Sequence, residues 1–502
     1  MTTTRQRGIP YVRVWTRAGG KLVLDGQIRG FQCQSSVNQP AGTFTLDIMP
    51  QQGTRAAAHA YNLPDLYRTI HPGDVVSIGF DRPGGIMLGI VDRVERQSSR
   101  VGPTTSESLR VTGRDFGKLL QDNIVHASLA VPDAPQFLAD VEQVTGPEHV
   151  LLVSLPGTWG PIATAGATEV PGVFVAESIQ TIVDWILRFG PSMTLPQLDA
   201  VAGGSGKPGE FIDTTASITT WNDARVWSEG LNDYNGSIYG FIKALLDPDF
   251  YEFYMTSIPV PGNDLPRIML VIRPKPFDEA TLDFAIVNED PGITWESLRT
   301  TTEALDYHTI TSAQVLSEEI GVSDTDVFSY YETTARFDLI GNEESRQAGL
   351  YYPLVDLWQL KRFGLRAYNA RVTMMASDLT VIIEGTGEGI SDLHSQVEEF
   401  RNRLLNWHRL ADYFESGSMK VLGRDHFRPG DPVFVDYMLP HLGSSRGVKF
   451  YAPQVTHSWT FGQPYVCNLQ LARGHNSSTI AAAKDLIAAD AAPGNPQHFA
   501  ST

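Results

Sequence analysis

The sequence predicts an α+β protein that is mainly β. Two barrel-like β domains related by an internal repeat flank an α+β middle domain, and helices connect them. Three observations carry this prediction. Apolar and polar residues alternate over short stretches near both ends of the chain, which is typical of strands with one buried face. Gly and Pro clusters interrupt these stretches at intervals suited to small antiparallel sheets. The same Pro-Gly-Asp turn occurs in both regions.

Residues 1–124 are expected to form the N-terminal β-barrel-like domain. Strands are predicted over 11–15, 44–48, 76–80, 90–94 and 109–111, because apolar residues recur there at every second position. The turns between them contain the Gly, Pro, Asn and Asp residues that such turns require. A short helical stretch to about Asn123 closes the unit.

Residues 125–300 are expected to form the α+β middle domain. Apolar residues fall at helical spacing over 179–187, and a second helix is predicted from Ser237 to Leu246. A Gly- and Pro-rich loop is predicted at 197–217. A strand pair follows, over 249–254 and 267–274.

Residues 301–415 are expected to form a connector of helices and strands, of which the best helical signal runs from Leu393 to Phe414. Residues 416–475 are expected to form the second β-barrel-like domain, completed by strands from 330–390. Cys467 alternates with polar residues in a predicted strand, so it is expected in the core. The tail at 476–502 contains an Ala-rich stretch from Ser478 to Ala492, and its end is expected to fray.

The repeat has three parts that agree in order and spacing. Pro-Gly-Asp stands at 72–74 and at 429–431, and each copy leads into a strand. A second strand follows, ending at Val94 and Val455, which lie 21 and 25 residues beyond the glycine of their turn. A third strand covers 109–111 or 469–471 and precedes a Gly-Arg or Arg-Gly pair. The alternative is two unrelated β units that share a common turn type.

Composition excludes several classes of protein. The 57 Asp and Glu residues against 39 Lys and Arg give a net charge of −18, whereas nucleic-acid readers and binders of anionic membranes rely on basic surfaces. Two cysteines exclude a disulfide-rich scaffold and multi-cysteine zinc sites. The N-terminal residues lead into no apolar segment, and no run approaches the ~18 apolar residues of a membrane-spanning helix. We therefore expect a soluble protein made in the cytoplasm, without stable membrane insertion.

No catalytic, cofactor-binding or metal-binding residues are predicted. The sequence has no His-Glu-x-x-His, Cys-x-x-Cys, Gly-x-Ser-x-Gly or phosphate-loop pattern, each of which has a defined chemical role. Neither Cys33 nor Cys467 lies at a helix N-terminus that would activate a thiol. Paired carboxylates such as Glu177 and Glu210 need no local motif, so glycoside hydrolysis stays open at this point.

Several segments together carry a family resemblance that covers most of residues 1–475. They are Pro72-Gly73-Asp74 with the strand to Val94, Thr112-Gly113-Arg114-Asp115, Tyr251-Glu252-Phe253-Tyr254 with Arg273-Pro274-Lys275-Pro276-Phe277, Lys361-Arg362-Phe363-Gly364-Leu365-Arg366, the 393–414 helix, Phe427-Arg428-Pro429-Gly430-Asp431, Gln454-Val455-Thr456-His457-Ser458-Trp459 and Leu469-Gln470-Leu471-Ala472-Arg473-Gly474. In this order they resemble the baseplate hub proteins of phage tails, the family that includes late-control hub proteins and the hub half of type VI secretion spike proteins.

The resemblance implies a structural virion protein rather than an enzyme. It implies a homotrimeric hub of the tail baseplate, assembled in the host cytoplasm, that joins the hexameric tail tube to the central spike or tip. Other baseplate proteins are further partners, with the tape-measure protein as an additional candidate. A channel for DNA exit is implied, whose wall we expect to be acidic or neutral because inward Lys or Arg would hold phosphate groups. No specific nucleic-acid binding and no cofactor are expected.

Two alternatives remain at the level of sequence. One is a lytic hub with a peptidoglycan hydrolase within 125–217 or in the acidic middle domain. The other is a carbohydrate-binding module that uses exposed aromatic residues, for which Trp159, Trp185, Trp221 and Trp227 are available, although core packing is the commoner use of tryptophan.

Overall fold

The computed structural model describes most of the two β regions and part of the middle of the chain. The described residues are 9–49, 63–80, 84–101, 104–122, 124–128, 173–174, 212–216, 225–227, 233–246, 251–260, 264–276, 308–335, 354–372, 374–375, 401–402, 404–439 and 444–490. The helix predicted over 179–187, most of the loop predicted at 197–217 and the first part of the 393–414 helix lie outside them. The end of the predicted loop is instead a strand, Ile212–Ala216, because its backbone pairs with residues 268–272.

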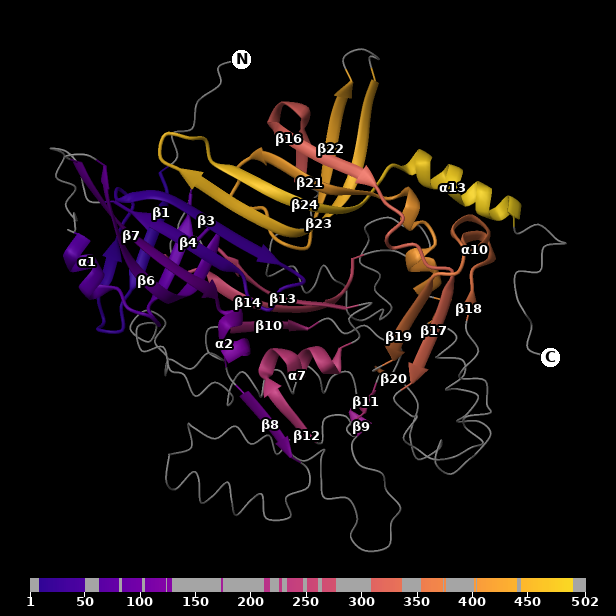
Figure 1. Cartoon of the computed structure of the whole chain (residues 1–502), viewed down its shortest axis with the longest axis horizontal. Helices are drawn as coiled ribbons and strands as arrows, with labels where there is room; N and C mark the ends of the chain where they lie inside the picture. The colour runs from indigo at the N-terminus through magenta and orange to yellow at the C-terminus, as the bar shows by residue number, and fades with distance from the viewer. Residues whose placement is uncertain are drawn as a thin grey trace, which may run out of the picture.

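One large sheet dominates the described structure, with thirteen strands in two halves. The first half, called the first unit, contains β1 (Tyr11–Trp15), β2 (Lys21–Val23), β3 (Ile28–Ser36), β4 (Thr43–Ile48), β5 (Val75–Gly79), β6 (Met87–Val101) and β7 (Thr104–Asp115). The second unit contains β15 (His308–Thr311), β16 (Val315–Val322), β21 (Glu415–Leu422), β22 (Asp431–Leu439), β23 (Ser444–Thr460) and β24 (Val466–His475). The two units lie side by side in Figure 1, the first in indigo and violet and the second mostly in orange and yellow.

The two units have the same strand order, which confirms the mainly β fold with an internal repeat. The order is β3-β4-β7-β6-β5-β1 in the first unit and β16-β21-β24-β23-β22-β15 in the second. The strands after Gly73 and Gly430, β5 and β22, therefore occupy equivalent places. One difference is that β1 runs antiparallel to β5, whereas β15 runs parallel to β22.

Two details of the expected repeat are corrected by strand pairing. The described strands between 330 and 372, namely β17 (Tyr330–Ala335), β18 (Leu354–Val355) and β19 (Ala367–Val372), form a separate sheet. The earlier strands β15 and β16 complete the second unit instead. The Gly-Arg pairs are also not equivalent, because Val111 opposes Val94 and Leu469 opposes Val455, which shifts the second pair by two residues. Sequence similarity alone could not fix this register, since a slip of two keeps every side chain on the same face.

The two Pro-Gly-Asp turns have the same hydrogen bonds. Gly73 N donates to Val91 O and Gly430 N donates to Ala452 O, each at 2.8 Å. The aspartate carboxylate of each turn accepts from the backbone N of the residue three positions earlier, again at 2.8 Å. Both glycines have positive φ, +92° and +85°, a conformation that residues with a Cβ adopt only with strain.

Alanine at either turn glycine is expected to destabilise the protein, by about 1–2 kcal/mol from the positive φ alone. Gly430→Ala is expected to cost more than Gly73→Ala, because its Cβ would lie 2.4 Å from the guanidinium of the buried Arg273, whereas the new Cβ at 73 meets only the end of the exposed Arg17. Urea unfolding of the two variants checks the order, and equal losses would contradict it.

Short elements surround the sheet. Helices α1 (Leu63–Thr69) and α2 (Gly117–Asp122) flank the first unit, and α7 (Ile238–Leu245) begins after Ser237, whose Oγ accepts from Gly240 N at 3.1 Å. The middle of the chain contributes β8 (Ile124–Ser128) with β12 (Asp233–Ser237), and the sheet of β10 (Ile212–Ala216), β14 (Arg267–Pro274) and β13 (Tyr251–Ile258). Short strands β9 (Val173–Phe174), β11 (Arg225–Trp227) and β20 (Met374–Met375) pair together. The second helix and the strand pair predicted for the middle are thus confirmed.

The remaining helices follow the predictions in part. Residues 401–402 and 404–408 are helical, and the predicted long helix gives way to the 3₁₀ turn η3 (Ala411–Tyr413) before Phe414. Helix α10 (Leu357–Phe363) begins at Asp356, whose carboxylate accepts from Trp358 N at 2.9 Å. The Ala-rich stretch forms α13 (Ser477–Asp490). No helix in the described part of the chain is long and apolar enough to cross a membrane.

A single cluster of buried apolar side chains extends through both units. It includes Phe44 and Leu46 of the first unit and Val433 and Phe450 of the second, each 0–2% exposed. The predicted core position of Cys467 is confirmed, since this residue is fully buried in the same cluster. The two units therefore share one hydrophobic core.

Candidate functional site

The two units are joined by direct strand pairing, a region we call the unit junction. β3 of the first unit pairs antiparallel with β23 of the second over seven residue pairs, from Gly30 opposite Thr460 to Ser36 opposite Gln454. Backbone bonds from Val37 N to Pro453 O (2.9 Å) and from Phe461 N to Arg29 O (2.7 Å) extend the junction at its two ends. A continuous ladder of this kind fixes the two units at one register.

Aromatic side chains seal one face of the unit junction. Phe31 and Phe80 come from the first unit, and Trp459 and Tyr465 from the second. The ring centroids of Phe80 and Tyr465 lie 4.3 Å apart, and those of Phe31 and Trp459 lie 6.2 Å apart. Aromatic contacts at these distances add stability beyond the area they bury, so they reinforce the strand pairing of the junction.

A buried histidine connects β23 to the segment before the second turn. The Nε2 atom of His457 lies 3.2 Å from Phe427 O, and its Nδ1 lies 2.7 Å from the Tyr465 hydroxyl. The carbonyl can only accept, so Nε2 donates to it and Nδ1 accepts from the tyrosine. Burial lowers the pKa of His457 to about 3, so the ring is neutral near neutral pH. These contacts give His457 a structural role within the second unit.

The β13–β14 hairpin braces the same turn through a buried ion pair. Glu252 and Arg273 oppose each other in the hairpin, form a salt bridge, and have side chains only 3–4% exposed. Arg273 also donates to Gly430 O at 2.7 Å, and the Tyr451 hydroxyl donates to Glu252. Burial keeps the pKa of Tyr451 well above its usual value, so the hydroxyl retains its proton. The β13–β14 hairpin is thus bonded directly to the turn of the second unit.

The hairpin also contacts the first unit. Asp264, in the connection between β13 and β14, forms a salt bridge with Lys21, and its backbone O accepts from Ser77 Oγ at 3.2 Å. Because one hairpin is bonded to both units, it fixes their relative position in addition to the strand pairing.

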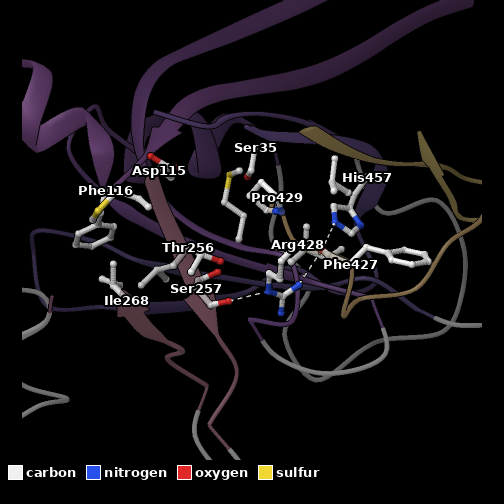
Figure 2. Close-up of a pocket in the computed structure, with 15 residues that line it drawn as sticks. Ser35, Asp115, Phe116, Thr256, Ser257, Ile268, Phe427, Arg428, Pro429 and His457 are labelled. Atoms are coloured by element: carbon white, nitrogen blue, oxygen red, sulfur yellow. Dashed lines mark hydrogen bonds between the residues drawn. The ribbon is translucent and has the colours of Figure 1, made fainter. Parts of the chain in front are cut away.

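Figure 2 shows the small cavity enclosed where these parts meet. Ser35, Asp115, Ser257, Arg428 and Pro429 line it, from β3, β7, β13 and the second turn. Its volume of about 20 Å³ suits one water molecule. Arg428 Nε donates to Ser257 O at 3.2 Å across it. The cavity is a packing feature of the junction and is too small for a substrate.

Asp115, from the Thr-Gly-Arg-Asp motif, is a buried carboxylate. It accepts from Gly42 N at 2.7 Å and from Gly117 N at 2.8 Å. Burial nevertheless raises its pKa to about 7, against the lowering effect of those two bonds. The preceding Arg114 pairs with Asp92 at 2.9 Å and with Asp122 at 3.0 Å. The motif therefore joins β7 to the β3–β4 turn and to α2, which is a structural role.

A larger cavity of about 490 Å³ lies between α7, β13, residues 407–416 and the second unit. Arg473, which has φ +52°, places its guanidinium 4.0 Å from the ring centroid of Trp407 and 4.3 Å from that of Phe414. These three residues line the cavity together with Lys243 and Tyr251. Its volume falls in the range of small-molecule sites, and part of its wall is the stack of Arg473 on Trp407 and Phe414.

The basic residues that the sequence places among acidic ones are used within the scaffold. Arg93 pairs with Glu95 at 2.5 Å, and Arg96 pairs with Glu107 at 2.8 Å. Arg114 also pairs with carboxylates, whereas Arg473 stacks on aromatic rings. The Glu252–Arg273 pair has only a weak signal in the sequence, one acidic residue in a mostly apolar strand and basic residues at the two ends of the next.

Neither cysteine is placed as a reactive thiol. Cys33 and Cys467 are free and buried, and burial raises the pKa of Cys467 to about 12 and that of Cys33 still further. Within the described residues, no cluster of His, Cys, Asp or Glu is arranged to hold a metal ion. The carboxylates Glu177 and Glu210, and the side chains of the four tryptophans considered for carbohydrate binding, lie outside the described residues.

No family model matches the chain, and no curated protein matches its sequence. Solved structures of tail proteins align with nearly all of it. The tail protein of Neisseria meningitidis MC58 is 12% identical, with 92% of this chain and 96% of that chain covered at a TM-score of 0.45. The 43 kDa tail protein of prophage MuSo2 from Shewanella oneidensis is 11% identical, with 94% and 98% covered at 0.41.

A type VI secretion system component of E. coli is 8% identical, with 90% of this chain and 74% of that chain covered at a TM-score of 0.33. The duplicated sheet is the feature of this chain on which a functional proposal can rest.

Proposed function

We propose that this protein is a structural hub of a phage or phage-like tail baseplate. Three copies form a ring that joins the hexameric tail tube to the central spike or tip and to surrounding baseplate proteins. The ring encloses a channel for DNA exit with an acidic or neutral wall, consistent with the net charge of −18.

The observation that carries the proposal is the duplication of one β unit within the chain. Two units with the same strand order lie in one continuous sheet. Three such chains present six similar units, which lets a three-fold assembly meet a six-fold partner on one side and a three-fold spike on the other. The strand pairing, aromatic contacts and braced turn of the unit junction support this role, because an adaptor between two partners needs units that keep a fixed relative position.

The purified protein is expected to have a particle mass of three times 55.2 kDa. Light scattering after size exclusion, over a range of protein concentrations, measures this mass. The same preparation should bind one end of isolated tail tubes in electron micrographs. A monomer that persists at high concentration and leaves tubes undecorated would contradict the hub.

The protein is further proposed to act by assembly and not by catalysis. The buried thiols with raised pKa values support this proposal, as does the structural use of Asp115 and His457. A peptidoglycan zymogram is therefore expected to show no clearing at the position of the chain, with lysozyme as the positive control. Clearing by native protein but not by heat-inactivated protein would reverse this proposal.

A further inference from the structure

The equivalence of the two units extends to individual residues of their outer strands. Val94 opposes Val111 in the first unit as Val455 opposes Leu469 in the second. On the next strand of each unit, Leu46 opposes Val111 and Met419 opposes Leu469, so Leu46 and Met419 are equivalent. Phe31 opposes Leu46, and Glu318 opposes Met419, so β16 residues 317–322 correspond to β3 residues 30–35.

A contact between distant strands supports this alignment independently. Asp74 and Asp431 occupy the same position in the two turns. Counting along the chain from them makes Phe80 equivalent to Tyr437. Phe80 lies against Phe31, with ring centroids 6.4 Å apart. Tyr437 donates its hydroxyl to Glu318 at 3.1 Å. The same two positions therefore touch in both units.

Among the described strands, only one of the two equivalent outer edges is paired. β3 pairs along its outer edge with β23 residues 454–460. Its counterpart β16 pairs with β21, and no second described strand pairs with it. The counterpart of 454–460 is β6 residues 93–99, which pair with β7 on one side and with no described strand on the other.

Side chains at the edge without a described partner are more exposed than their equivalents at the unit junction. Val455 at the unit junction is 1% exposed, whereas its equivalent Val94 is half-buried. On β16, Leu316 and Val322 are 47% and 64% exposed. An open strand edge with exposed apolar residues invites pairing with another chain, and proteins normally protect such an edge.

We infer that the β16 edge of one copy pairs antiparallel with β6 residues 93–99 of the next copy, repeating the β3–β23 pairing between chains. The inference rests on the proposed function for the number of copies, and on the strand registers for the contact itself. The contact is head-to-tail, so it closes into a ring when the rotation between neighbours allows it.

The inferred register brings complementary groups together. It places Val322 opposite Val94, and Glu319 opposite Gln97. It also places Glu318 opposite Ser98 and diagonal to Arg96, a distance that long side chains span. Where the unit junction has the aromatic pair Phe31 and Trp459, this contact has Glu318 and Ser98. Polar residues at these positions suit a contact between copies that fold separately and then associate.

Disulfide formation between engineered cysteines tests both the contact and its register. The double variant Glu319→Cys/Gln97→Cys places the new thiols on directly opposed residues, about 4.5–5.5 Å apart at Cβ. The matched control Glu319→Cys/Glu95→Cys moves one thiol two residues along the same face, to a separation of about 7–8 Å, which is too long for a disulfide. The native cysteines are buried and give little background.

Mild oxidation of the Gln97 variant is expected to give covalent dimers and trimers on non-reducing gels that reductant reverses, while the Glu95 variant and the single variants stay monomeric. Trimers by light scattering in which neither pair cross-links, or both do equally, would overturn the inferred pairing and leave the hub standing. Covalent dimers in a dimeric particle would support the pairing and overturn the trimer. Monomers without cross-links would overturn both.

Discussion

Replacing Arg273 with methionine is expected to lower the free energy of unfolding by about 3–5 kcal/mol, because it leaves the Glu252 carboxylate buried without its cationic partner. The substitution also removes the bond to Gly430 O and so loosens the braced second turn. Methionine keeps most of the side-chain length, which limits any cavity. Urea denaturation followed by tryptophan fluorescence measures the loss.

Two further variants make this expectation specific to the buried ion pair. Asp324→Asn breaks an exposed pair with Arg366, whose side chains are 54% and 35% exposed, and is expected to leave the unfolding midpoint nearly unchanged because surface ion pairs contribute little. Glu252→Gln combined with Arg273→Met removes both charges and is expected to recover part of the loss. If Arg273→Met were as mild as Asp324→Asn, the hairpin could not brace the turn as described.

Deprotonation of the Asp115 carboxyl is expected to lower the free energy of unfolding as the pH rises. Burial raises the pKa of this carboxyl from 3.8 to about 7 in the folded state. The folded protein therefore holds the proton to a higher pH than the unfolded chain does. The resulting stabilisation is complete below about pH 4 and is lost as the pH rises through about 7. At about 1.36 kcal/mol for each unit of pKa, the total is about 4 kcal/mol.

The Asp115→Asn variant isolates this contribution from that of the other carboxylates. Asparagine cannot titrate, so the difference in unfolding free energy between wild type and variant should change by about 4 kcal/mol between acid and neutral pH. The variant also differs from wild type by a constant amount of stability. Asparagine has one acceptor oxygen, so its NH₂ group faces the backbone N–H of Gly42 or Gly117, and two donors cannot bond to each other. Parallel slopes against pH for the two proteins would show that the Asp115 carboxyl does not titrate in this range.

Much of the local structure could be predicted because it depends on neighbouring residues. Alternation identified β1, β4, β5 and β24, since side chains on a strand point to opposite faces at every step. The Pro-Gly-Asp turns were predictable for the same reason, because Pro fixes φ and Gly accepts the positive φ that both turns have. The repeated turns then indicated a duplicated unit before any long-range contact was known.

Local sequence patterns did not indicate which segments of the chain supply the strands that complete the second unit. Strands from 330–390 were expected there, but β15 and β16 provide the pairing, and β21 follows only at Glu415. Loop closure costs grow slowly with loop length, so a long insertion between two paired strands leaves almost no trace in the sequence. The chain can therefore leave the sheet after β16 and return at β21.

By itself, then, the sequence determined a mainly β protein with two copies of one unit, the turns that begin them, and the absence of familiar catalytic motifs. Only the tertiary structure decided that β3 pairs with β23 to make one sheet, that Glu252 and Arg273 meet in the interior, and that no described strand pairs with the equivalent edge on β16. The physical reason is that strand partners and buried charge pairs are selected by hydrogen bonding and burial between segments distant in sequence, whereas alternation and turn chemistry act between neighbours.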